Sequence, residues 1–305
     1  MKAPVSFSLL VPCYNGEKYI DSFLENFSKL STPFDEILFY DDASTDNSAQ
    51  IIQSKGYRLI KGEKNNGPGY ARNRLAEASK ADYIHFHDID DEINPTFLEL
   101  VNDKIDLSPS EVIIGNAEWI DGETRQTVIS WQYNAAEIKP DPLSYFMIHP
   151  LGIINTVYKR DSFLNIGGFN EKIHCWEDAD LHIQFALAGA SFSVIDAVLA
   201  YSIRHNNGIS KNQAWCWNCR MNFLEKYKQI LDKSHLLILG KEFEKTAYAL
   251  FHCNEFSKAL RSFLNSRKSG YDAPTINNAA LKLVKKISPL SAFLLRGLAV
   301  KLNQF

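Results

Sequence analysis

The sequence lacks several features that would place a protein in a specialised class. Its five cysteines are scattered and odd in number, which argues against a disulfide framework and favours a reducing compartment. No apolar signal stretch follows Met1, and no apolar run reaches the ~18 residues of a membrane span. A net charge of -3 offers no basic face to nucleic acid. We therefore expect a cytoplasmic globular protein that does not bind nucleic acid.

Two common ligand-site motifs are also missing. Cys216 and Cys219 form a Cys-x-x-Cys pair in a helix-like stretch, but no second pair completes a zinc site, so core packing is favoured. The segment after the first expected strand reads Val11-Pro12-Cys13-Tyr14-Asn15-Gly16. It lacks the Gly-x-Gly-x-x-Gly that a dinucleotide-binding Rossmann enzyme requires, which disfavours that class.

Strand-like and helix-like segments alternate through the first third of the chain. Apolar runs at residues 5–11, 36–40, 57–60 and 83–87 predict strands, and the apolar spacing between them predicts helices. This alternation predicts an α/β fold with βαβ units, in which a mainly parallel sheet is flanked by helices. At 305 residues the chain is long enough for one large domain and an appendage.

Acidic or turn-forming motifs follow three of these strands. They are Pro12-Cys13-Tyr14, Asp41-Asp42 and Asp88-Ile89-Asp90-Asp91. Ligands of open α/β sheets bind beyond the carboxyl ends of the strands, so the three motifs should line one crevice. Crowded carboxylates repel one another unless a cation lies among them, and Mg²⁺ or Mn²⁺ prefers carboxylate oxygen. A solvated acidic turn is the alternative interpretation of the last motif.

The segments after residue 91 are less regular. Asn94 and Pro95 predict the N-cap and first position of a helix. Further strands are predicted at 111–115, 117–120, 127–133, 152–158, 191–195 and 198–203, and helices at 160–166 and from 176 to 189. Helices predominate from about residue 212. We therefore expect a mixed α/β domain over residues 1–210 and a helical C-terminal region over residues 211–305.

The tail from Asn277 is basic and amphipathic. It contains five Lys or Arg residues and no Asp or Glu, among many apolar side chains. Such a segment can lie on an anionic membrane surface, here as a peripheral contact at the inner face of the cell membrane. A helix packed on its own domain, with solvated lysines, is the alternative.

Taken together, these motifs resemble glycosyltransferase family 2, whose members have the GT-A nucleotide-sugar-binding fold. The resemblance covers roughly residues 5–210 and rests on the order of the motifs. They are Val11–Asn15, Asp41–Asp46, Asn66–Asn73, Asp88–Asp91, Gly167–Glu171 and Trp176–Leu181. Two positions depart from the family pattern, because a Gly is commoner where Ala43 stands and a small residue is more usual where Ile89 stands.

The resemblance implies a set of residues that bind the donor nucleotide. Tyr14 would stack on the nucleobase, and Asp42 or Asp41 would accept its imide N–H, although a role for both acids in capping the turn is the alternative. Arg72 would approach the nucleotide from the helix after the glycine-rich loop, although a surface arginine is the alternative. The donor-binding residues implied in this way are Pro12, Tyr14, Asp41, Asp42, Gly67, Arg72, Asp88 and Ile89.

A second implied set holds a divalent cation, Mn²⁺ or Mg²⁺. Asp90 would coordinate the cation bound to the diphosphate, and Asp88 would meet either the ribose or the metal. Asp91 would be a second ligand or a support. His205, which follows the last expected strand, would reach the metal or the diphosphate.

A third implied set lies on the acceptor side. Asp178 would be the general base for the acceptor hydroxyl, with Glu177 as its neighbour and Trp176 beside both. The adjacent carboxylate and the aromatic ring would raise the pKa of Asp178. Acids at a helix N-terminus are also favourable without any catalytic role, which is the alternative interpretation.

These expectations combine into one function. The chain would be an inverting hexosyl- or N-acetylhexosaminyl-transferase that moves a sugar from a nucleoside diphosphate, with UDP as the expected nucleotide. A glycan or lipid-linked glycan would be the acceptor, as in surface polysaccharide biosynthesis. The alternative is a non-catalytic protein of the same fold that binds nucleotide sugars or serves as a scaffold.

Overall fold

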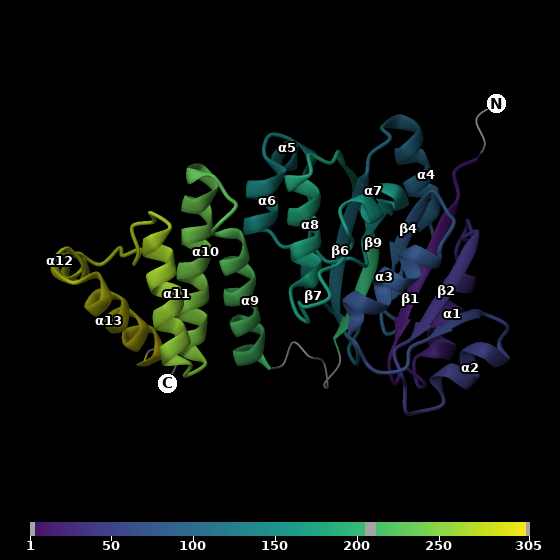
Figure 1. Ribbon diagram of the computed structural model, residues 1–305, viewed down its shortest axis with the longest axis horizontal. Coiled ribbons are helices and arrows are strands. Elements are labelled where there is room, and N and C mark those ends of the chain that lie inside the picture. Colours follow the sequence, from purple (N-terminus) through teal and green to yellow (C-terminus); the bar gives the residue numbers. More distant parts are fainter. Residues whose placement is uncertain (1–3, 205–211, 303–305) are drawn as a thin grey trace. The chain divides into compact units, whose positions relative to one another are not determined.

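The computed structural model describes residues 4–204 and 212–302, which fall into two compact units (Figure 1). The first unit comprises Met1–Phe146 and Pro150–Gly208, and the second comprises Met147–His149 and Ile209–Phe305. The motifs that predict the site all belong to the first unit.

Strands and helices alternate in the first unit. The strands are β1 (Phe7–Cys13), β2 (Glu36–Asp41), β3 (Arg58–Lys61), β4 (Tyr83–Phe86), β5 (Glu92–Ile93), β6 (Val112–Asp121), β7 (Thr127–Trp131), β8 (Thr156–Lys159) and β9 (Phe192–Arg204). The helices before residue 204 are α1 (Ile20–Ser28), α2 (Ser48–Ser54), α3 (Pro68–Ala78), α4 (Phe97–Leu107), α5 (Ala135–Ile138), α6 (Pro142–Ile148), α7 (Arg160–Asn165) and α8 (Glu177–Leu187).

One mixed sheet organises this unit, with the strand order β3-β2-β1-β4-β8-β6-β9-β5 and β7 paired to β6. The first four strands of that order are parallel, which confirms the predicted βαβ arrangement. Their register pairs Cys13 with Asp41, and Leu10 with Phe86. The carboxyl ends of β1, β2 and β4, and the motifs that follow them, therefore lie at one edge of the sheet.

Alternating side chains bury both faces of the sheet. Leu9 and Val11 of β1 belong to a core cluster with residues of α1, α2 and α4. On the opposite face, Phe86 packs against Tyr158, Phe163 and Phe169, with ring centroids 5.2–6.0 Å apart. A strand that is covered on both faces of a sheet is apolar along its length. For this reason the buried strands could be predicted from apolar runs in the sequence.

The edge strand β3 is short and carries charge at both ends. Its four residues begin with Arg58 and end with Lys61, and both side chains are exposed. Charged residues on a short edge strand discourage pairing with a second chain.

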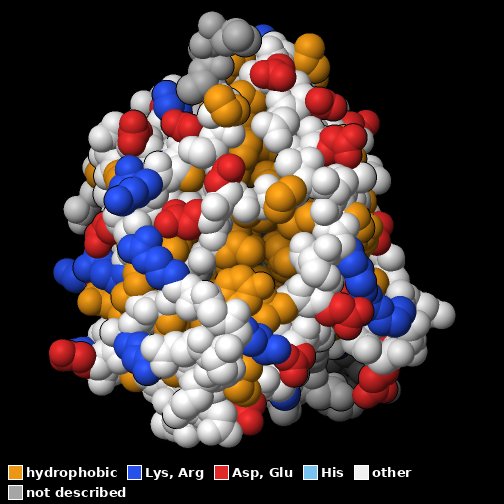
Figure 2. All heavy atoms as spheres, turned by 90° about the vertical axis from the view of Figure 1, so that its right-hand side faces the viewer, with side chains coloured by type: hydrophobic (Ala, Val, Ile, Leu, Met, Phe, Trp, Pro, Cys, Tyr) orange, Lys and Arg blue, Asp and Glu red, His pale blue; other side chains and the backbone are white. Residues whose placement is uncertain are grey.

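Figure 2 views the side of the molecule where α1, α2 and β2 lie in Figure 1, and shows a central apolar band with charged side chains around it.

The start of α4 differs from the prediction. The helix begins at Phe97, not at Pro95, and Thr96 is its N-cap. Asn94 instead forms a preceding turn, where its carbonyl oxygen accepts the Phe97 N–H and its side-chain oxygen accepts the Thr96 N–H. Asparagine stabilises such turns as well as caps, so its presence alone does not locate the first helical residue.

The strands after residue 110 also differ from the prediction. Segments predicted as separate strands are the single strands β6 and β9, and β8 starts only at Thr156. The register between β6 and β9 shifts at Gly115 and Asn116, and Asn116 donates a hydrogen bond to Asp196 in the looped-out part of β9. A glycine or an acid inside a strand therefore marks a bulge here, not a strand end. The segments 117–120 and 127–133, which the sequence predicts as strands, pair in antiparallel fashion as parts of β6 and β7.

The second unit is helical, as predicted for the region after residue 212. Its helices are α9 (Gln213–Tyr227), α10 (Lys233–His252), α11 (Phe256–Lys268), α12 (Ala279–Ile287) and α13 (Pro289–Leu302). Phe293 of α13 is buried and stacks on Phe263 of α11, with centroids 4.5 Å apart. In the described ranges, no helix has both the length and the apolar character needed to cross a membrane.

Candidate active site

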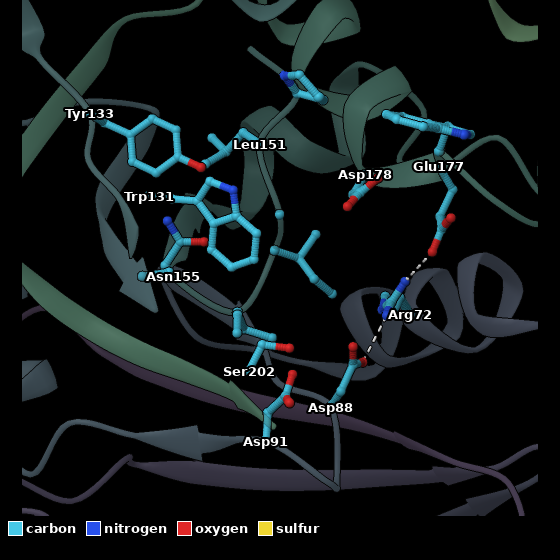
Figure 3. Close-up of a pocket in the computed structure, with 16 residues that line it drawn as sticks. Arg72, Asp88, Asp91, Trp131, Tyr133, Leu151, Asn155, Glu177, Asp178 and Ser202 are labelled. Carbon is cyan, nitrogen blue, oxygen red and sulfur yellow. Dashed lines mark hydrogen bonds and ion pairs between the residues drawn. The ribbon is translucent and has the colours of Figure 1, made fainter. Parts of the chain in front are cut away.

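A cavity of about 360 Å³ lies at the carboxyl edge of the sheet in the first unit. Figure 3 shows Arg72, Glu177 and Asp178 on one side of it and Trp131, Tyr133 and Leu151 on the other. Asp88, Asp91 and Ser202 lie between the two sides. One wall is therefore charged and the other is aromatic and apolar, a division that suits a ligand with both polar and apolar surface.

Arg72 joins two acidic motifs that are far apart in the sequence. Its Nη2 donates to Asp88 Oδ1 at 2.7 Å and its Nη1 donates to Glu177 Oε1 at 2.9 Å. Burial acts to lower the pKa of Arg72, but the two carboxylates outweigh it and raise that pKa above its usual range. The guanidinium is therefore a fixed cation in the cavity wall. The structure places Arg72 in the cavity wall and not on the outer surface of its helix, and its contact with the nucleotide stays a prediction.

Asn73 binds the motif Gly167–Glu171 through two hydrogen bonds to Phe169. Its side chain accepts the Phe169 N–H at 2.8 Å and donates to the Phe169 carbonyl at 2.9 Å. Gly168 has a φ of +67°, and a Cβ there would lie 2.4 Å from the Asn73 Oδ1. The motifs at 66–73 and 167–171, separate in sequence, therefore interlock in the structure.

Asp178 presents its carboxylate to the cavity from the first turn of α8 (Figure 3). Burial and the neighbouring charge of Glu177 raise the pKa of Asp178 to about 7, while the Ala179 N–H and Arg72 act to lower it. Asp178 can therefore exchange a proton near neutral pH. Asp180, the other acid of this turn, is fully buried and accepts a hydrogen bond from Gln184.

Trp176 precedes α8 in a left-handed backbone conformation, with φ at +73°. This region is costly for a bulky residue, and such strain clusters at functional sites. Trp176 lines the cavity together with Glu177 and Asp178, the two residues that follow it, and their acceptor-side role stays a prediction.

The acidic turn after β4 contributes unequally to the cavity. Asp88 and Asp91 line it, and Asp90 is half-buried in the same turn. Asp91 accepts the Ile203 N–H at 2.8 Å. Burial, together with the charges of Asp88 and Asp90, raises the pKa of Asp91 well above its usual range. Asp91 therefore ties the turn to β9, the supporting role that the sequence left open.

The packing of Ile89 accounts for a side chain that is larger than the family usually has at this position. Its side chain is 8% exposed and belongs to the core cluster. A Cβ on Gly16 would lie 3.2 Å from the Ile89 Cγ2, so the larger side chain packs closely over this glycine. Because that side chain is buried in the core, a contact between Ile89 and a donor would come from its main chain.

Asp41 and Asp42 are both buried at the end of β2 and both accept main-chain N–H groups. Asp42 accepts those of Asn66 and Gly67 at 2.8–3.1 Å, and Asp41 accepts that of Ser44 at 3.3 Å. A carboxylate has about four acceptor positions, so these bonds are compatible with a further contact to a nucleobase. That contact stays a prediction.

The loop after β1 lies beside this acidic turn. Pro12 pairs with Tyr40 in the sheet, and Tyr14, which follows, is 49% exposed. Asn15 donates its N–H to Ser44 and accepts a hydrogen bond from the Thr45 N–H. The predicted nucleobase partners therefore sit on two loops held together by hydrogen bonds, with the Tyr14 ring available for stacking.

The aromatic wall of the cavity, which contains Trp131 and Tyr133, was not predicted from the sequence. Tyr133 is half-buried, and burial together with the nearby Tyr145 and Asp178 raises its pKa. Asn155 lines the same side and donates to the Gly115 carbonyl oxygen at 2.5 Å. No sequence signal singled out these residues, because Tyr133 follows the exposed strand β7 and Asn155 ends the loop before β8. His205, predicted as a metal or diphosphate ligand, lies outside the described residues.

The comparison with protein families matches residues 8–170 to the family described as Glycosyl transferase family 2. This match covers more than half of the chain and includes four of the six ordered motifs in full. The chain therefore belongs to glycosyl transferase family 2.

Curated relatives carry related names. The chain is 32% identical to Glycosyltransferase GlyG of Streptococcus pneumoniae over 36% of this chain and 38% of that protein. It is 33% identical to the Poly(ribitol-phosphate) beta-N-acetylglucosaminyltransferase TarS of Staphylococcus aureus over 39% of this chain and 22% of TarS. It is 26% identical to the Minor teichoic acid biosynthesis protein GgaA of Bacillus subtilis over 78% of this chain and 55% of GgaA. The chain thus spans less than two thirds of each relative.

A solved structure shares the fold. S. aureus TarS 1-349 in complex with UDP-GlcNAc superimposes with a TM-score of 0.63 at 22% identity, covering 86% of this chain and 79% of that chain. At this identity the likeness shows the fold alone, and it confirms the predicted GT-A fold.

Proposed function

We propose that this chain is an inverting glycosyltransferase that moves a hexose or N-acetylhexosamine from a UDP-sugar to a hydroxyl group, with Asp178 as the general base. One observation carries the proposal. A carboxylate with a pKa of about 7 opens into a cavity that also contains the Arg72–Asp88–Glu177 cluster. UDP is the expected nucleotide because the TarS neighbour was crystallised with UDP-GlcNAc and with UDP.

The proposed reaction is a single displacement. The acceptor oxygen forms a bond to the anomeric carbon while the bond from that carbon to the diphosphate oxygen breaks. Asp178 takes the proton of the acceptor hydroxyl, and UDP leaves with the electron pair. Attack from the face opposite the leaving group inverts the anomeric centre.

Glu177 and Asp178 would divide their roles in this reaction. Glu177 is bound by Arg72 at 2.9 Å, so its charge is already balanced. Asp178 is left as the proton acceptor, and its raised pKa matches a base that works near neutral pH. The fixed guanidinium of Arg72 would also favour negative charge developing on the departing diphosphate.

The acidic turn fits a divalent cation held partly by the donor. Within the described ranges, three His, Cys, Asp or Glu side chains do not converge on one point as a complete metal site. Mg²⁺ commonly binds one or two carboxylates plus substrate phosphates, a set that Asp88 and Asp90 can provide with the donor diphosphate. Mn²⁺ or Mg²⁺ bound there would supply positive charge to the leaving group.

The Asp90→Ala variant tests this assignment. We expect a loss of Mn²⁺- or Mg²⁺-dependent donor turnover of at least about 100-fold, since a ligand of the cation is removed. The fold should persist, because the change lies in a turn at the edge of the sheet. Asp103→Ala, an acid on α4 away from the cavity, is the control. Normal metal-dependent turnover in Asp90→Ala would exclude Asp90 as a ligand.

The proposed acceptor is a hydroxyl of a glycan or lipid-linked glycan at the inner face of the cell membrane. Two relatives support a cell-surface polymer, because their names contain poly(ribitol-phosphate) and teichoic acid. A peripheral membrane contact through α12 and α13 would bring the chain to such an acceptor.

The experiment that tests the function compares Asp178→Asn with the parent chain. A panel of UDP-sugars, beginning with UDP-GlcNAc, is assayed for UDP release with Mn²⁺, Mg²⁺ or EDTA. Loss of a general base typically costs on the order of 10² to 10⁴ in rate, so the variant should fall in that range. Its affinity for UDP and Mn²⁺, measured by calorimetry, should stay within a few-fold.

Two other outcomes would revise the proposal. Turnover at the parent rate in Asp178→Asn would move the base to another carboxylate. A parent chain that binds UDP-sugars but turns over none of them, with or without metal, would instead favour the non-catalytic alternative.

A further inference from the structure

The aromatic wall of the cavity continues outward along the sheet. Ala117 of β6, Trp131 of β7 and Ser202 of β9 line the cavity. Side chains two residues apart in a strand point to the same face. Trp119, Ile129 and Arg204, each two residues further along these three strands, therefore extend that face beyond the cavity. We call Trp131, Trp119, Ile129 and Arg204 the aromatic strip.

Direct contacts hold the strip together. The rings of Trp131 and Trp119 stack with centroids 6.3 Å apart, and the Arg204 guanidinium lies 5.4 Å from the centroid of Trp119. Trp131 is 37% exposed and Ile129 is 39% exposed. The strip thus runs from a cavity residue, over a second indole, to an exposed cation.

The chemistry of the strip matches a sugar chain that carries negative charge. Indole faces bind the C–H face of a sugar ring by burying apolar surface. A guanidinium that rests on an aromatic ring can present its planar N–H groups to a carboxylate or a phosphate. Asp121 lies near enough to Arg204 for their charges to interact, but its Oδ1 already accepts N–H and O–H groups of the 121–124 turn.

We propose that the aromatic strip is the acceptor subsite and that it selects an anionic glycan. The proposal rests on the proposed function, because it takes the hydroxyl next to Asp178 as the reacting group. The acceptor unit beyond that hydroxyl lies on Trp131 and Trp119, and the anionic group of the following unit meets Arg204. The anionic group is a carboxylate of an acidic sugar or a phosphodiester.

Calorimetry on the full chain in the presence of UDP tests the proposal without requiring turnover. The probes are a tetrasaccharide of alternating glucuronic acid and N-acetylglucosamine, a tetramer of ribitol phosphate, and a neutral N-acetylglucosamine tetrasaccharide. We expect at least one anionic probe to bind ~10-fold more tightly than the neutral one, since a charge-assisted contact is added. The preferred anionic probe identifies the source of the charge.

Matched variants assign the selectivity to the strip. Arg204→Gln should remove the preference for the anionic probe, and Trp119→Ala should weaken all bound probes. The controls are Arg125→Gln, which removes an exposed arginine of the same hairpin that is paired with Glu92 of β5, and Ser130→Ala, which pairs with Glu118 on the opposite face of β7. Both controls should bind as the parent does.

Three results would overturn the inference. They are equal binding of neutral and anionic probes, no measurable binding of any probe, and equal effects of Arg204→Gln and Arg125→Gln. Donor turnover, assayed separately, reports on the proposed function. A chain that turns over UDP-sugar but shows one of these results would lose the acceptor subsite and keep the transferase assignment.

Discussion

Two adjacent acids at the start of α8 acquire different properties from their neighbours. Glu177 faces a buried arginine, whereas Asp178 is buried beside the charge of Glu177 and has its pKa raised to about 7. Chemically similar side chains can therefore serve as a charged anchor and as a proton acceptor. The sequence alone could rank Asp178 as the base only through the family resemblance, because the Arg72 contact spans 105 positions.

The pH dependence of the rate follows from this pKa. A base acts in its ionised form, so kcat/KM should rise about tenfold per pH unit below pH 7 and level off above it. Steady-state rates between pH 5 and pH 9, in Asp178→Asn and the parent, provide the measurement. A parent profile that is flat over that range, after correction for metal binding, would contradict Asp178 as the titrating group.

The free energy of unfolding should also depend on the ionisation of Asp178, but it should fall as pH rises, whereas kcat/KM should rise. The pKa of Asp178 is about 7 in the folded chain against 3.8 for an ordinary aspartate. Between these values the folded chain holds a proton that the unfolded chain has lost, so the free energy of unfolding falls as pH rises. At 1.36 kcal/mol per pK unit the loss has a ceiling of about 4 kcal/mol. Asp178→Asn should therefore gain Tm over the parent at pH 8 and much less at pH 4.

Ala43 occupies a backbone conformation that favours glycine. Its φ is +61°, in the turn after β2 where the family more often has a glycine. The left-handed conformation costs an alanine roughly 1–2 kcal/mol, partly offset by the greater flexibility of glycine when unfolded. We expect Ala43→Gly to raise the free energy of unfolding by about 0.5–1 kcal/mol and Ala43→Val to lower it. Denaturant unfolding measures both.

A matched control separates backbone strain from a general effect of glycine. Ala49 lies in α2 with a helical backbone, so Ala49→Gly should lower the free energy of unfolding by about 1 kcal/mol. If Ala43→Gly destabilised the chain as Ala49→Gly does, the strain at position 43 would be negligible.

At the scale of helices and strands, the parallel half of the sheet was predictable. Each of its strands contains a short apolar run flanked by turn residues, and β1 and β4 are buried along almost their whole length. The three motifs fall at one edge for a geometric reason, namely that parallel strands end on the same side. The strands β3, β2, β1 and β4 are therefore followed by four of the six motifs that resemble the family.

The other half of the sheet was harder to predict because it is irregular. Gly115 interrupts the apolar pattern of β6, yet a Cβ there would lie 2.2 Å from the Leu199 side chain, so the strand continues through a close contact with β9. β7 is exposed along its whole length, and nothing in its composition marks Trp131 as a cavity residue. The continuity of β6 through Gly115 and the position of Trp131 depend on which strands pair with each other. That pairing is determined by the fold and is not visible in the local sequence.

At the scale of the whole molecule, α12 and α13 form the exposed surface of the basic tail. Large apolar side chains are exposed along both helices, namely Leu283, Ile287, Leu290, Leu294, Leu295, Leu298 and Val300. Lys282 and Lys286 are exposed on α12, whereas Lys285 is paired with Asp272 at 2.7 Å. Apolar side chains flanked by lysines favour binding to an anionic membrane surface, and this stays a prediction.

Charge reversal tests the membrane contact better than deletion does, since deletion would remove the buried Phe293. The double variant Lys282→Glu and Lys286→Glu should lose at least about 2 kcal/mol of affinity, since each basic residue near the surface contributes about 1 kcal/mol and each glutamate adds repulsion. Sedimentation with phosphatidylglycerol vesicles, at low and high salt, measures it. Lys241→Glu, an exposed residue of α10, is the control. Equal sedimentation of all three proteins would leave the packed-helix interpretation.

The hydrogen bonds of Asp42 have a mechanical consequence. This carboxylate fixes the N–H of Gly67, the N-cap of α3, and Arg72 stands in the second turn of that helix. A short helix is stiff, so a displacement at Asp42 would be passed along its axis to Arg72 and onward to Glu177. The glycine at the start of α3 is thus the point at which the turn after β2 is connected to the Arg72–Glu177 contact. We therefore expect a substitution at Asp42 to shift the proton affinity of Asp178, by a coupling small enough that the affinity of Asp178→Asn for UDP stays within a few-fold.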